Sequence, residues 1–438
     1  MPSVTQRSLA ALPSASMDTN TSKLIDIAHL RKGMFVQLDM GWMSHPFAAD
    51  SFKVTTDEQI QTLRSLGLAE VRYVPSKSDA AVVEALAYGL MPGRAGAAGP
   101  DEDAALLTQH RQDLLETQGQ SLQACTQQFS DAVGSYEQVT RLLPADPAAA
   151  RDHSVALVNA CVDTLRNNGE SAIRLLPDLP GERSAMHPVN VMVVSLLLGK
   201  ALGQSDQELL DLGVAALLHD VGKLQLPERV RSLDRHFAPE EILAYQSHVT
   251  FSVAAAERME LSPAVIAGIA QHHEMVDGSG FPLKLHGSQI STQGKIIALV
   301  NRYDNLCNPL RDGSVAFTPH EALSVLFAQM KARFDSAVLG AFIRMMGVYP
   351  PGSVVQLVND RFAMVVSVNS SRPLRPRIIV HDTRVPRQDA LVLDMEAMPE
   401  LGIRRSLKPA QLPVAAYEYL MPRERICCFF ERTVDSQG

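Results

Sequence analysis

The chain has 438 residues, with 40 lysines and arginines against 48 aspartates and glutamates, which gives a formal net charge of −8. This acidic balance excludes a chain built mainly to bind a nucleic-acid polymer, because such proteins usually carry a basic balance. Hydrophobic residues make up 46% of the chain and charged residues 20%. This composition excludes global disorder and predicts packed cores.

Proline, glycine and helix-capping signals along the sequence predict five segments and a mainly α fold class. They are, in chain order, a disordered lead (1–21), a small α+β module (22–80), a linker with a helical connector (81–147), an all-helical domain (148–348) and a β-rich extension (349–438). The module should contain a helix near residues 56–66. In the extension, we expect strands at Val354–Val358, Met364–Val368, Arg377–Val380 and Ala390–Leu393.

Capping signals divide the all-helical segment into helices. Ser205 is followed three residues later by Glu208, which is a capping box, and Ser291 can cap a helix that must end before Pro309. Gly222 is expected to stop the helix that starts at Ser205. Residues 148–346 are otherwise expected to be almost all helix.

The cysteines and the apolar stretches indicate the compartment. The five cysteines are odd in number and form no Cys-x-x-Cys pair, which argues against a disulfide framework or a thiolate zinc site and for a reducing compartment. The most apolar stretch, residues 189–198, is much shorter than the roughly 20 residues that cross a bilayer. We therefore expect a cytoplasmic protein with no membrane insertion.

Five of the 13 histidines fall in the helical segment at His187, His219, His248, His272 and His273. His219 precedes Asp220 at a helix end, so an imidazole and a carboxylate that can bridge two cations lie together. Imidazole and carboxylate without thiolate suit Fe, Mn or Zn at a catalytic site. Paired metal ions are a known device for phosphoryl chemistry, and Lys223 is placed to neutralise a phosphate oxygen.

Several of these residues also suit purely structural roles. His248 could be a buried helix histidine, and Phe281 equally suits core packing. Gly278 and Gly280 would let the backbone approach a ligand closely, but they could also serve only a tight turn. These alternatives stay open from the residues alone.

Residues 175–350 resemble the HD-GYP family, metal-dependent phosphodiesterases of the HD superfamily that hydrolyse cyclic di-GMP. The resemblance rests on the run His219-Asp220-Val221-Gly222-Lys223 and on the run from His272-His273-Glu274 through Asp277-Gly278-Ser279-Gly280-Phe281-Pro282. Residues 23–78 also resemble the small uncharacterised module that often precedes HD-GYP domains, most closely at Leu30–Val36.

The resemblance implies two divalent transition-metal ions, Fe or Mn, and a metal-bound hydroxide that attacks the phosphodiester to give linear pGpG, GMP or both. Asp220, as the bridging ligand, and Lys223, on the phosphate, would be the catalytic residues. The implied metal ligands are His187, His219, Asp220, His248, His272, His273 and Asn301. The implied substrate contacts are Lys223, Asp277, Gly278, Gly280, Phe281 and Arg311.

The sequence departs from the family pattern at three points. Asn301 stands where the family has its last aspartate ligand; its neutral amide could bind a hard cation or be an ordinary polar residue, with Asp304 on the same helix face in partial compensation. Phe281 replaces the tyrosine of the Gly-Tyr-Pro signature. The basic run after the last ligand is shortened, which leaves Arg311 as the nearby substitute.

We therefore expect a bacterial signalling hydrolase that acts on cyclic di-GMP. The main alternative is a catalytically weakened protein that serves as a cyclic di-GMP sensor or a protein-interaction module, and a more remote one is an HD-type phosphohydrolase of another nucleotide. Diguanylate cyclases, other signalling proteins and a second copy of the chain are the protein partners that we expect.

Overall fold

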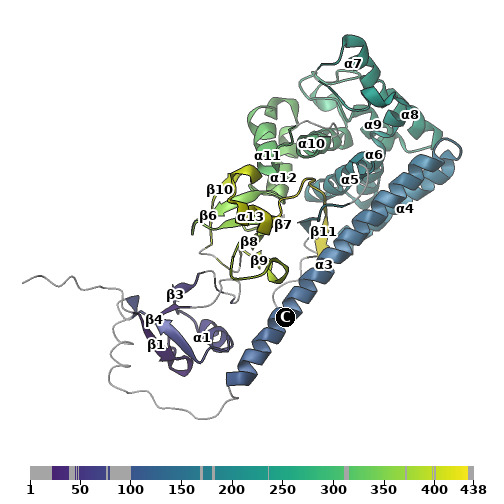
Figure 1. Cartoon of the computed structure of the whole chain (residues 1–438). Helices are drawn as coiled ribbons and strands as arrows, with labels where there is room; N and C mark the ends of the chain where they lie inside the picture. Colours follow the sequence, from purple (N-terminus) through teal and green to yellow (C-terminus); the bar gives the residue numbers. More distant parts are fainter. Residues whose placement is uncertain are drawn as a thin grey trace, which may run out of the picture. The chain divides into compact units, whose positions relative to one another are not determined.

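The chain is described here by a computed structural model (Figure 1). The structure describes residues 22–38, 45, 47, 49–74, 77–78, 100–167, 171–179, 183–234, 236–309, 315–369, 372–396, 398 and 401–432. The predicted lead and the first part of the predicted linker lie outside these residues. The chain divides into two compact units, residues 1–113 and 114–438, and each is described by itself.

The first unit contains a four-stranded antiparallel sheet in the order β1-β4-β2-β3 and one α-helix before β4. Its elements are β1 (Lys23–Asp26), η1 (Ile27–His29), β2 (Phe35–Gln37), β3 (Ser51–Lys53), α1 (Asp57–Arg64) and β4 (Glu70–Tyr73). Thr56 and Gln59 form a capping box at the start of α1, and Leu63 of that helix packs into a core with Met34 and Val36. The predicted α+β character of the module is confirmed.

The second unit is mainly helical, as predicted. The long helix α3 (Pro100–Leu142) crosses the boundary between the units. The other helices are α4 (Pro147–Asn167), α5 (Arg183–Ala201), α6 (Asp206–Leu218), η4 (Val221–Gln225), η5 (Glu228–Val230), α7 (Pro239–Gln246), α8 (His248–Arg258), α9 (Pro263–Gln271), η6 (Gly287–Gln289), α10 (Thr292–Cys307), α11 (Pro319–Ala328), η7 (Lys331–Arg333), α12 (Ser336–Met346) and, within the C-terminal segment, α13 (Val414–Leu420). Within the described residues, no helix combines the length and the apolar character needed to cross a bilayer.

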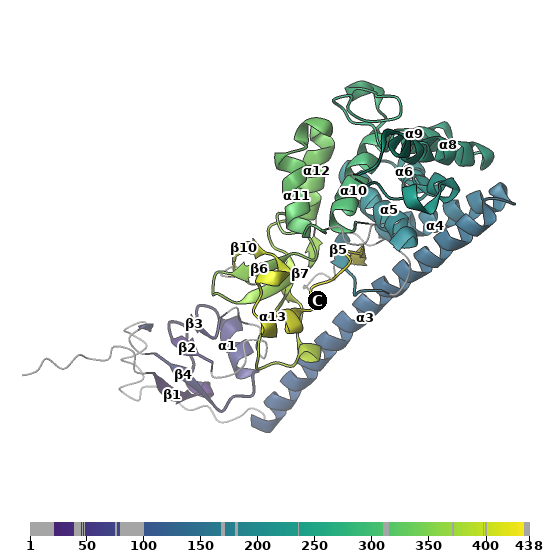
Figure 2. The ribbon, with the colours of Figure 1, turned by 45° about the horizontal axis from the view of Figure 1, so that its top comes forward.

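Helix α5 is the central helix of the unit. Residues 185–199 are buried without interruption, as expected of a helix that is apolar on nearly all sides. It packs against α6 and α10, while α9 packs against α6, α8 and α10; the same helices lie together in Figure 2. The predicted caps are confirmed, because Ser205 and Ser291 accept hydrogen bonds from Glu208 N and Gly294 N at the starts of α6 and α10.

A seven-stranded antiparallel sheet completes the unit. Its strands are β5 (Ser171–Leu175), β6 (Val354–Leu357), β7 (Phe362–Asn369), β8 (Arg377–Val380), β9 (Leu393–Asp394), β10 (Ile403–Leu407) and β11 (Cys428–Arg432), and the short helices η8 (Arg387–Asp389) and η9 (Pro409–Gln411) lie between them. The path runs β10-β6-β7-β5-β11, and β8 pairs with β7 and β9. Arg174 on β5 and Glu431 on β11 form a buried ion pair at 3.2 Å. The last strand is therefore held beside a strand that precedes the helical core.

Three local expectations were wrong. Strand β5 lies in the segment expected to be almost all helix, so the C-terminal extension does not form its sheet alone. The region expected to be a strand at Ala390–Leu393 contributes only Leu393, because the 3-10 helix η8 and its cap occupy the chain before it. The apolar run from Pro188 predicts that His187 opens a helix, but α5 starts at Arg183 and His187 lies within it.

Gly222 has a different role from the predicted one. Helix α6 ends at Leu218, and Gly222 lies in η4 without a positive φ. A Cβ at this position would meet the backbone oxygen of His248 at 2.2 Å. The glycine therefore permits the close contact between η4 and α8, and this contact brings His248 beside the His219-Asp220 pair.

Candidate metal centre and its cavity

Five histidines and one aspartate from four segments meet at the centre of the helical core. His219 is the C-cap of α6 and Asp220 follows it, while His248 begins α8. His272 is the C-cap of α9 with His273 next in the chain, and His187 comes from α5. The predicted convergence of these six residues occurs in the structure.

The carboxylate of Asp220 lies between two groups of histidines. Its Oδ2 atom lies 3.6 Å from Nε2 of His187 and 3.4 Å from Nε2 of His219. Its Oδ1 atom lies 3.3 Å from Nε2 of His248 and 3.6 Å from Nε2 of His272. Each carboxylate oxygen therefore faces a different pair of imidazoles.

The donor atoms form two sets that share Asp220. One set is His187, His219 and Asp220, and the other is Asp220, His248, His272 and His273; in each set the ligand atoms lie within 4.8 Å of one another. A carboxylate that bridges two metal ions needs this division of its two oxygens. The arrangement fits a two-metal site.

Backbone hydrogen bonds fix the tautomers of three of the histidines. In each, Nδ1 donates to the carbonyl oxygen three residues earlier: His219 to Ala216 at 2.7 Å, His248 to Tyr245 at 2.5 Å, and His272 to Ile269 at 2.6 Å. Because Nδ1 carries the hydrogen in a neutral ring, Nε2 has a free lone pair. All three Nε2 lone pairs are thus available to a metal ion.

Several of these inward-facing atoms have no hydrogen-bond partner among the residues that the structure describes. They are Nε2 of His187, Nε2 of His219, Nε2 of His273 and Oδ1 of Asp220. The Nε2 atoms of His248 and His272 lie 3.3 Å apart and bear no hydrogen to share. Two nitrogen ligands about 2.1 Å from one metal ion are separated by roughly this distance. Buried unsatisfied atoms are costly, so these residues fit bound metal.

Burial keeps most of the cluster uncharged in the metal-free protein. Burial lowers the pKa of His219 to about 4 and that of His248 to about 3. It also lowers the pKa of His273 well below the ordinary histidine value. These rings are therefore neutral at pH 7, which is the form that binds metal.

His187 has the opposite shift. Burial alone would lower its pKa, but the interactions of the ring with the carboxylates of Asp220 and Asp304 outweigh burial and raise the pKa to about 9. Nδ1 of His187 lies 2.5 Å from Oδ2 of Asp304. In the metal-free protein this imidazole is a cation held between two carboxylates.

Asp304 is placed behind His187 and does not face Asp220. Its Oδ1 atom accepts a hydrogen bond from Asn308 at 2.9 Å and another from Asn190. Asn190 and Asn308 also donate to the backbone oxygen of Ile426, at 3.1 and 2.9 Å. The expected compensation for Asn301 by a second ligand is therefore wrong: Asp304 orients His187, as carboxylates commonly do for metal-binding histidines.

Lys223 binds Asp220 from the cavity side. Its Nζ atom lies 2.6 Å from Oδ2 of Asp220 and 5.4 Å from the centre of the Tyr245 ring. Burial lowers the pKa of Lys223, but the charge of Asp220 outweighs it and the net pKa is raised. The lysine is a permanent positive charge beside the bridging carboxylate.

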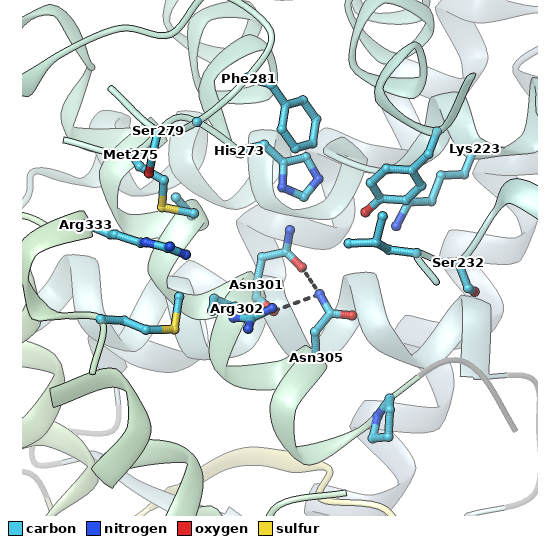
Figure 3. Close-up of a pocket in the computed structure, with 16 residues that line it drawn as sticks. Lys223, Ser232, His273, Met275, Ser279, Phe281, Asn301, Arg302, Asn305 and Arg333 are labelled. Atoms are coloured by element: carbon cyan, nitrogen blue, oxygen red, sulfur yellow. Dashed lines mark hydrogen bonds between the residues drawn. The ribbon is translucent and has the colours of Figure 1, made fainter. Parts of the chain in front are cut away.

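A cavity of about 370 Å³ adjoins this cluster (Figure 3). It is lined by Lys223, Ser232, Leu233, Tyr245, His273, Met275, Ser279, Gly280, Phe281, Ala298, Asn301, Arg302, Asn305, Pro309, Met330 and Arg333. Among the predicted substrate contacts, Lys223, Gly280 and Phe281 line it. Asp277 and Gly278 do not, and Arg311 lies outside the described residues.

The glycine loop is shaped by its own packing. Gly278 has a φ of +78°, and a Cβ there would meet the ring of His286 at 2.1 Å. A Cβ at Gly280 would meet backbone atoms of His273 and Glu274 at 2.5 Å. The carboxylate of Asp277 accepts hydrogen bonds from Ser279. The tight-turn interpretation of these glycines therefore has direct structural support.

Two further residues of the motif hold this loop and His273. Glu274 is buried and accepts backbone hydrogen bonds from Leu283, Lys284 and Leu285. The ring of Phe281 stacks on His273 with centroids 4.4 Å apart and an interplanar angle of 24°. The ring thus covers one face of a candidate metal ligand.

Asn301 lines the cavity, and its amide oxygen already has a partner. Nδ2 of Asn305 donates to Oδ1 of Asn301 at 2.5 Å and to its backbone oxygen at 2.9 Å (Figure 3). The asparagine is buried.

Some residues of the cavity and its support were missed from the sequence. Arg302 follows Asn301 directly and Asn305 is one helical turn on, so helical spacing was a signal for both. Tyr245 lies three residues before His248. Arg333 and Asn190 gave no signal, because only the fold brings them to the site.

Comparisons with known proteins agree with this geometry. Residues 170–338 match a family described as "HD domain", and residues 22–153 match one described as "Domain of unknown function (DUF3391)". A cyclic di-GMP phosphodiesterase of Pseudomonas aeruginosa is 28% identical over 82% of this chain and 84% of its own length. The chain thus carries an HD domain. This HD domain follows the DUF3391 match, which confirms the resemblance of the N-terminal region.

Other relatives match a smaller share of the chain. A cyclic di-GMP phosphodiesterase of Borreliella burgdorferi is 25% identical over 46% of this chain and 53% of its own length. A 3'3'-cGAMP-specific phosphodiesterase of Vibrio cholerae is 25% identical over 41% of this chain and 39% of its own length. The chain is thus an HD-domain hydrolase whose relatives are named for two different cyclic dinucleotides.

Proposed function

We propose that this protein is a metal-dependent phosphodiesterase of the HD-GYP type that hydrolyses cyclic di-GMP to linear pGpG, GMP or both. The observation that carries the proposal is Asp220, whose two oxygens face separate histidine sets beside a cavity. The nitrogen and oxygen donors suit two divalent transition-metal ions, with Fe or Mn as the proposed metals.

The metal ions and the residues around them would have separate roles in hydrolysis. When bound, the two ions supply Lewis acidity that lowers the pKa of water and draws charge from the phosphodiester. Asp220 would hold both ions, and the backbone-bonded histidines would keep their Nε2 atoms directed at them. Lys223 would neutralise a phosphate oxygen from the cavity, and Phe281 would keep the ring of His273 in place.

Product analysis tests this function. Purified protein is incubated with cyclic di-GMP under reducing conditions with Fe²⁺ or Mn²⁺, and the nucleotides are separated by chromatography. We expect linear pGpG or GMP to form only with metal, and 3'3'-cGAMP to be cleaved more slowly. Absence of linear product with every metal, from protein that retains its metal ions, would contradict the proposal.

A cyclic di-GMP sensor is the second candidate, and one observation favours it. Asn301 carries no charge and its amide oxygen is engaged by Asn305, so the seventh predicted ligand is weaker than a carboxylate. A sensor would bind cyclic di-GMP without forming product. Calorimetric binding beside the product assay separates the two candidates.

The setting of this activity stays a prediction. A cytoplasmic location is expected from the cysteines and the short apolar stretches of the sequence, and signalling partners such as diguanylate cyclases and a homodimer are expected from the resemblance. The boundaries of the five predicted segments are likewise proposals.

A further inference from the structure

Two arginines line the cavity besides Lys223. In Figure 3, Arg333 extends into the cavity from the left and Lys223 from the right, with His273 between them; Arg302 lies below His273. Nζ of Lys223 forms an ion pair with Oδ2 of Asp220 at 2.6 Å. The arginines are separate positive groups on the same cavity.

In the described part of the chain, neither guanidinium group has a close partner. Within the residues that the structure describes, no hydrogen bond or ion pair reaches the side chain of Arg302 or Arg333. Arg333 acts on Asp277 only as a longer-range charge, and it repels Arg302. Two like charges on one cavity with no close ion-pair partner are stabilised when an anion enters.

Both arginines lie on segments that are connected to residues of the candidate metal centre. Arg302 follows Asn301 on α10, and the backbone oxygen of Arg333 accepts a hydrogen bond from Val276 N at 2.9 Å. Val276 lies three residues after His273. A ligand that contacted these guanidinium groups would therefore be held in register with the histidine cluster.

The substrate class has a second anionic group that needs a site. A cyclic dinucleotide carries two phosphodiesters on opposite sides of its ring, so only one can lie at Asp220 at a time. The guanidinium fork matches phosphate oxygens in geometry and charge. We propose that Arg302 and Arg333 form a second phosphate subsite that binds the phosphodiester not being cleaved. This inference rests on the proposed function and names the feature that would select cyclic dinucleotides.

Comparing two substrates tests the subsite. Wild type, Arg302→Gln and Arg333→Gln are assayed with cyclic di-GMP and with bis(p-nitrophenyl) phosphate, which has a single phosphodiester. We expect the KM for cyclic di-GMP to rise about tenfold or more in each variant. The loss of kcat/KM should be smaller with the single phosphodiester.

Matched variants sharpen the result. Lys331→Gln removes one positive charge from the same short helix η7 at an exposed position outside the cavity, and it should leave both substrates unaffected. Arg333→Lys keeps the charge without the fork and should recover only part of the loss. Because both arginines would hold one phosphate, the double variant should lose less than the product of the single losses.

The outcomes separate the subsite from the proposed function. An unchanged KM for cyclic di-GMP, or equal losses with both substrates, overturns the subsite while wild-type turnover stands. If wild type binds cyclic di-GMP without turnover, calorimetry decides: binding weakened about tenfold in the arginine variants supports the subsite and overturns only the hydrolysis. Equal binding overturns the subsite, and no binding by wild type overturns both.

Discussion

The carboxylate of Asp304 lies 2.5 Å from Nδ1 of His187, on the side of the imidazole opposite Asp220. Asp304 is thus linked to the metal centre through a histidine and does not face it directly. The same carboxylate accepts hydrogen bonds from Asn190 and Asn308, which also bind the backbone of Ile426. The C-terminal segment is in this way connected to the orientation of one candidate ligand.

Removing the charge of Asp304 should weaken metal binding. Asp304→Asn keeps the volume but loses the carboxylate that orients His187, so we expect metal affinity at the set containing His187 to fall roughly 10- to 100-fold. Competition titration with a chelator measures this. Asp382→Asn, at a buried aspartate that pairs with Arg361 and Arg384, controls for a general loss of stability. Equal affinities in wild type and Asp304→Asn would contradict the orienting role.

Asn190 should contribute to both stability and metal binding. Its side chain joins Asp304, the backbone oxygen of Ile426 and the backbone N–H of Cys428. Asn190→Ala removes all three of these hydrogen bonds in a buried region, so the free energy of unfolding should fall by about 2–4 kcal/mol. Urea unfolding measures it, with Asn359→Ala at an exposed position as the control. If the free energy of unfolding falls less in Asn190→Ala than in Asn359→Ala, the hydrogen bonds between Asn190 and the C-terminal segment do not stabilise the fold.

The metal-free protein should lose stability as the pH falls below about 6.5. The pKa values of about 4 for His219 and about 3 for His248 lie below the unfolded value of about 6.5. Between the folded and the unfolded pKa values, the unfolded chain binds more protons than the folded chain. The free energy of unfolding therefore rises with pH over this range, by on the order of a few kcal/mol. Urea unfolding at pH 4.5 to 6.5 measures the slope, which should be smaller in His219→Gln.

His187 should give the opposite trend at alkaline pH. Because its folded pKa is raised to about 9, its stabilising effect is complete below about 6.5 and is lost as the pH rises through 9. The metal-free protein should therefore be most stable near pH 6.5, and His187→Gln should flatten the alkaline side alone. A pH-independent free energy of unfolding in wild type would contradict both shifts.

Restoring a carboxylate at Asn301 should strengthen the site. Asn301→Asp adds a charged oxygen where the present amide is engaged by Asn305, so we expect tighter metal binding and a turnover about tenfold higher or more. Asn305→Ala frees the amide oxygen and should give a smaller gain. Asn359→Asp adds the same charge at an exposed site and should have no effect. A fall in metal content in Asn301→Asp would show that Asn301 is not directed at the metals.

The parts of the fold and site that were predictable are those encoded within a few residues. Ser205 and Ser291 specify their helix starts through a hydrogen bond three residues away. The adjacent His219 and Asp220 fix two ligands at once, since both follow the same helix. Local spacing and local chemistry suffice in such cases.

The remaining features depend on contacts between distant segments. Strand β5 is paired on both sides, by β7 and by β11, and its buried Arg174 is matched by Glu431, 257 residues away. Arg333 reaches the cavity through a backbone contact with Val276. The glycine loop was predicted as a ligand-binding element, but the collisions that a Cβ would make with His286 and with backbone became visible only in three dimensions.

The most direct test of the two-metal account is Asp220→Asn, measured for metal content and for hydrolysis of cyclic di-GMP in the same preparation. We predict that this variant folds, holds fewer metal ions than wild type at both donor sets, and loses turnover by about 100-fold or more. His153→Ala, at an exposed histidine on α4, should match wild type in both. Wild-type metal content and turnover in Asp220→Asn would contradict the account.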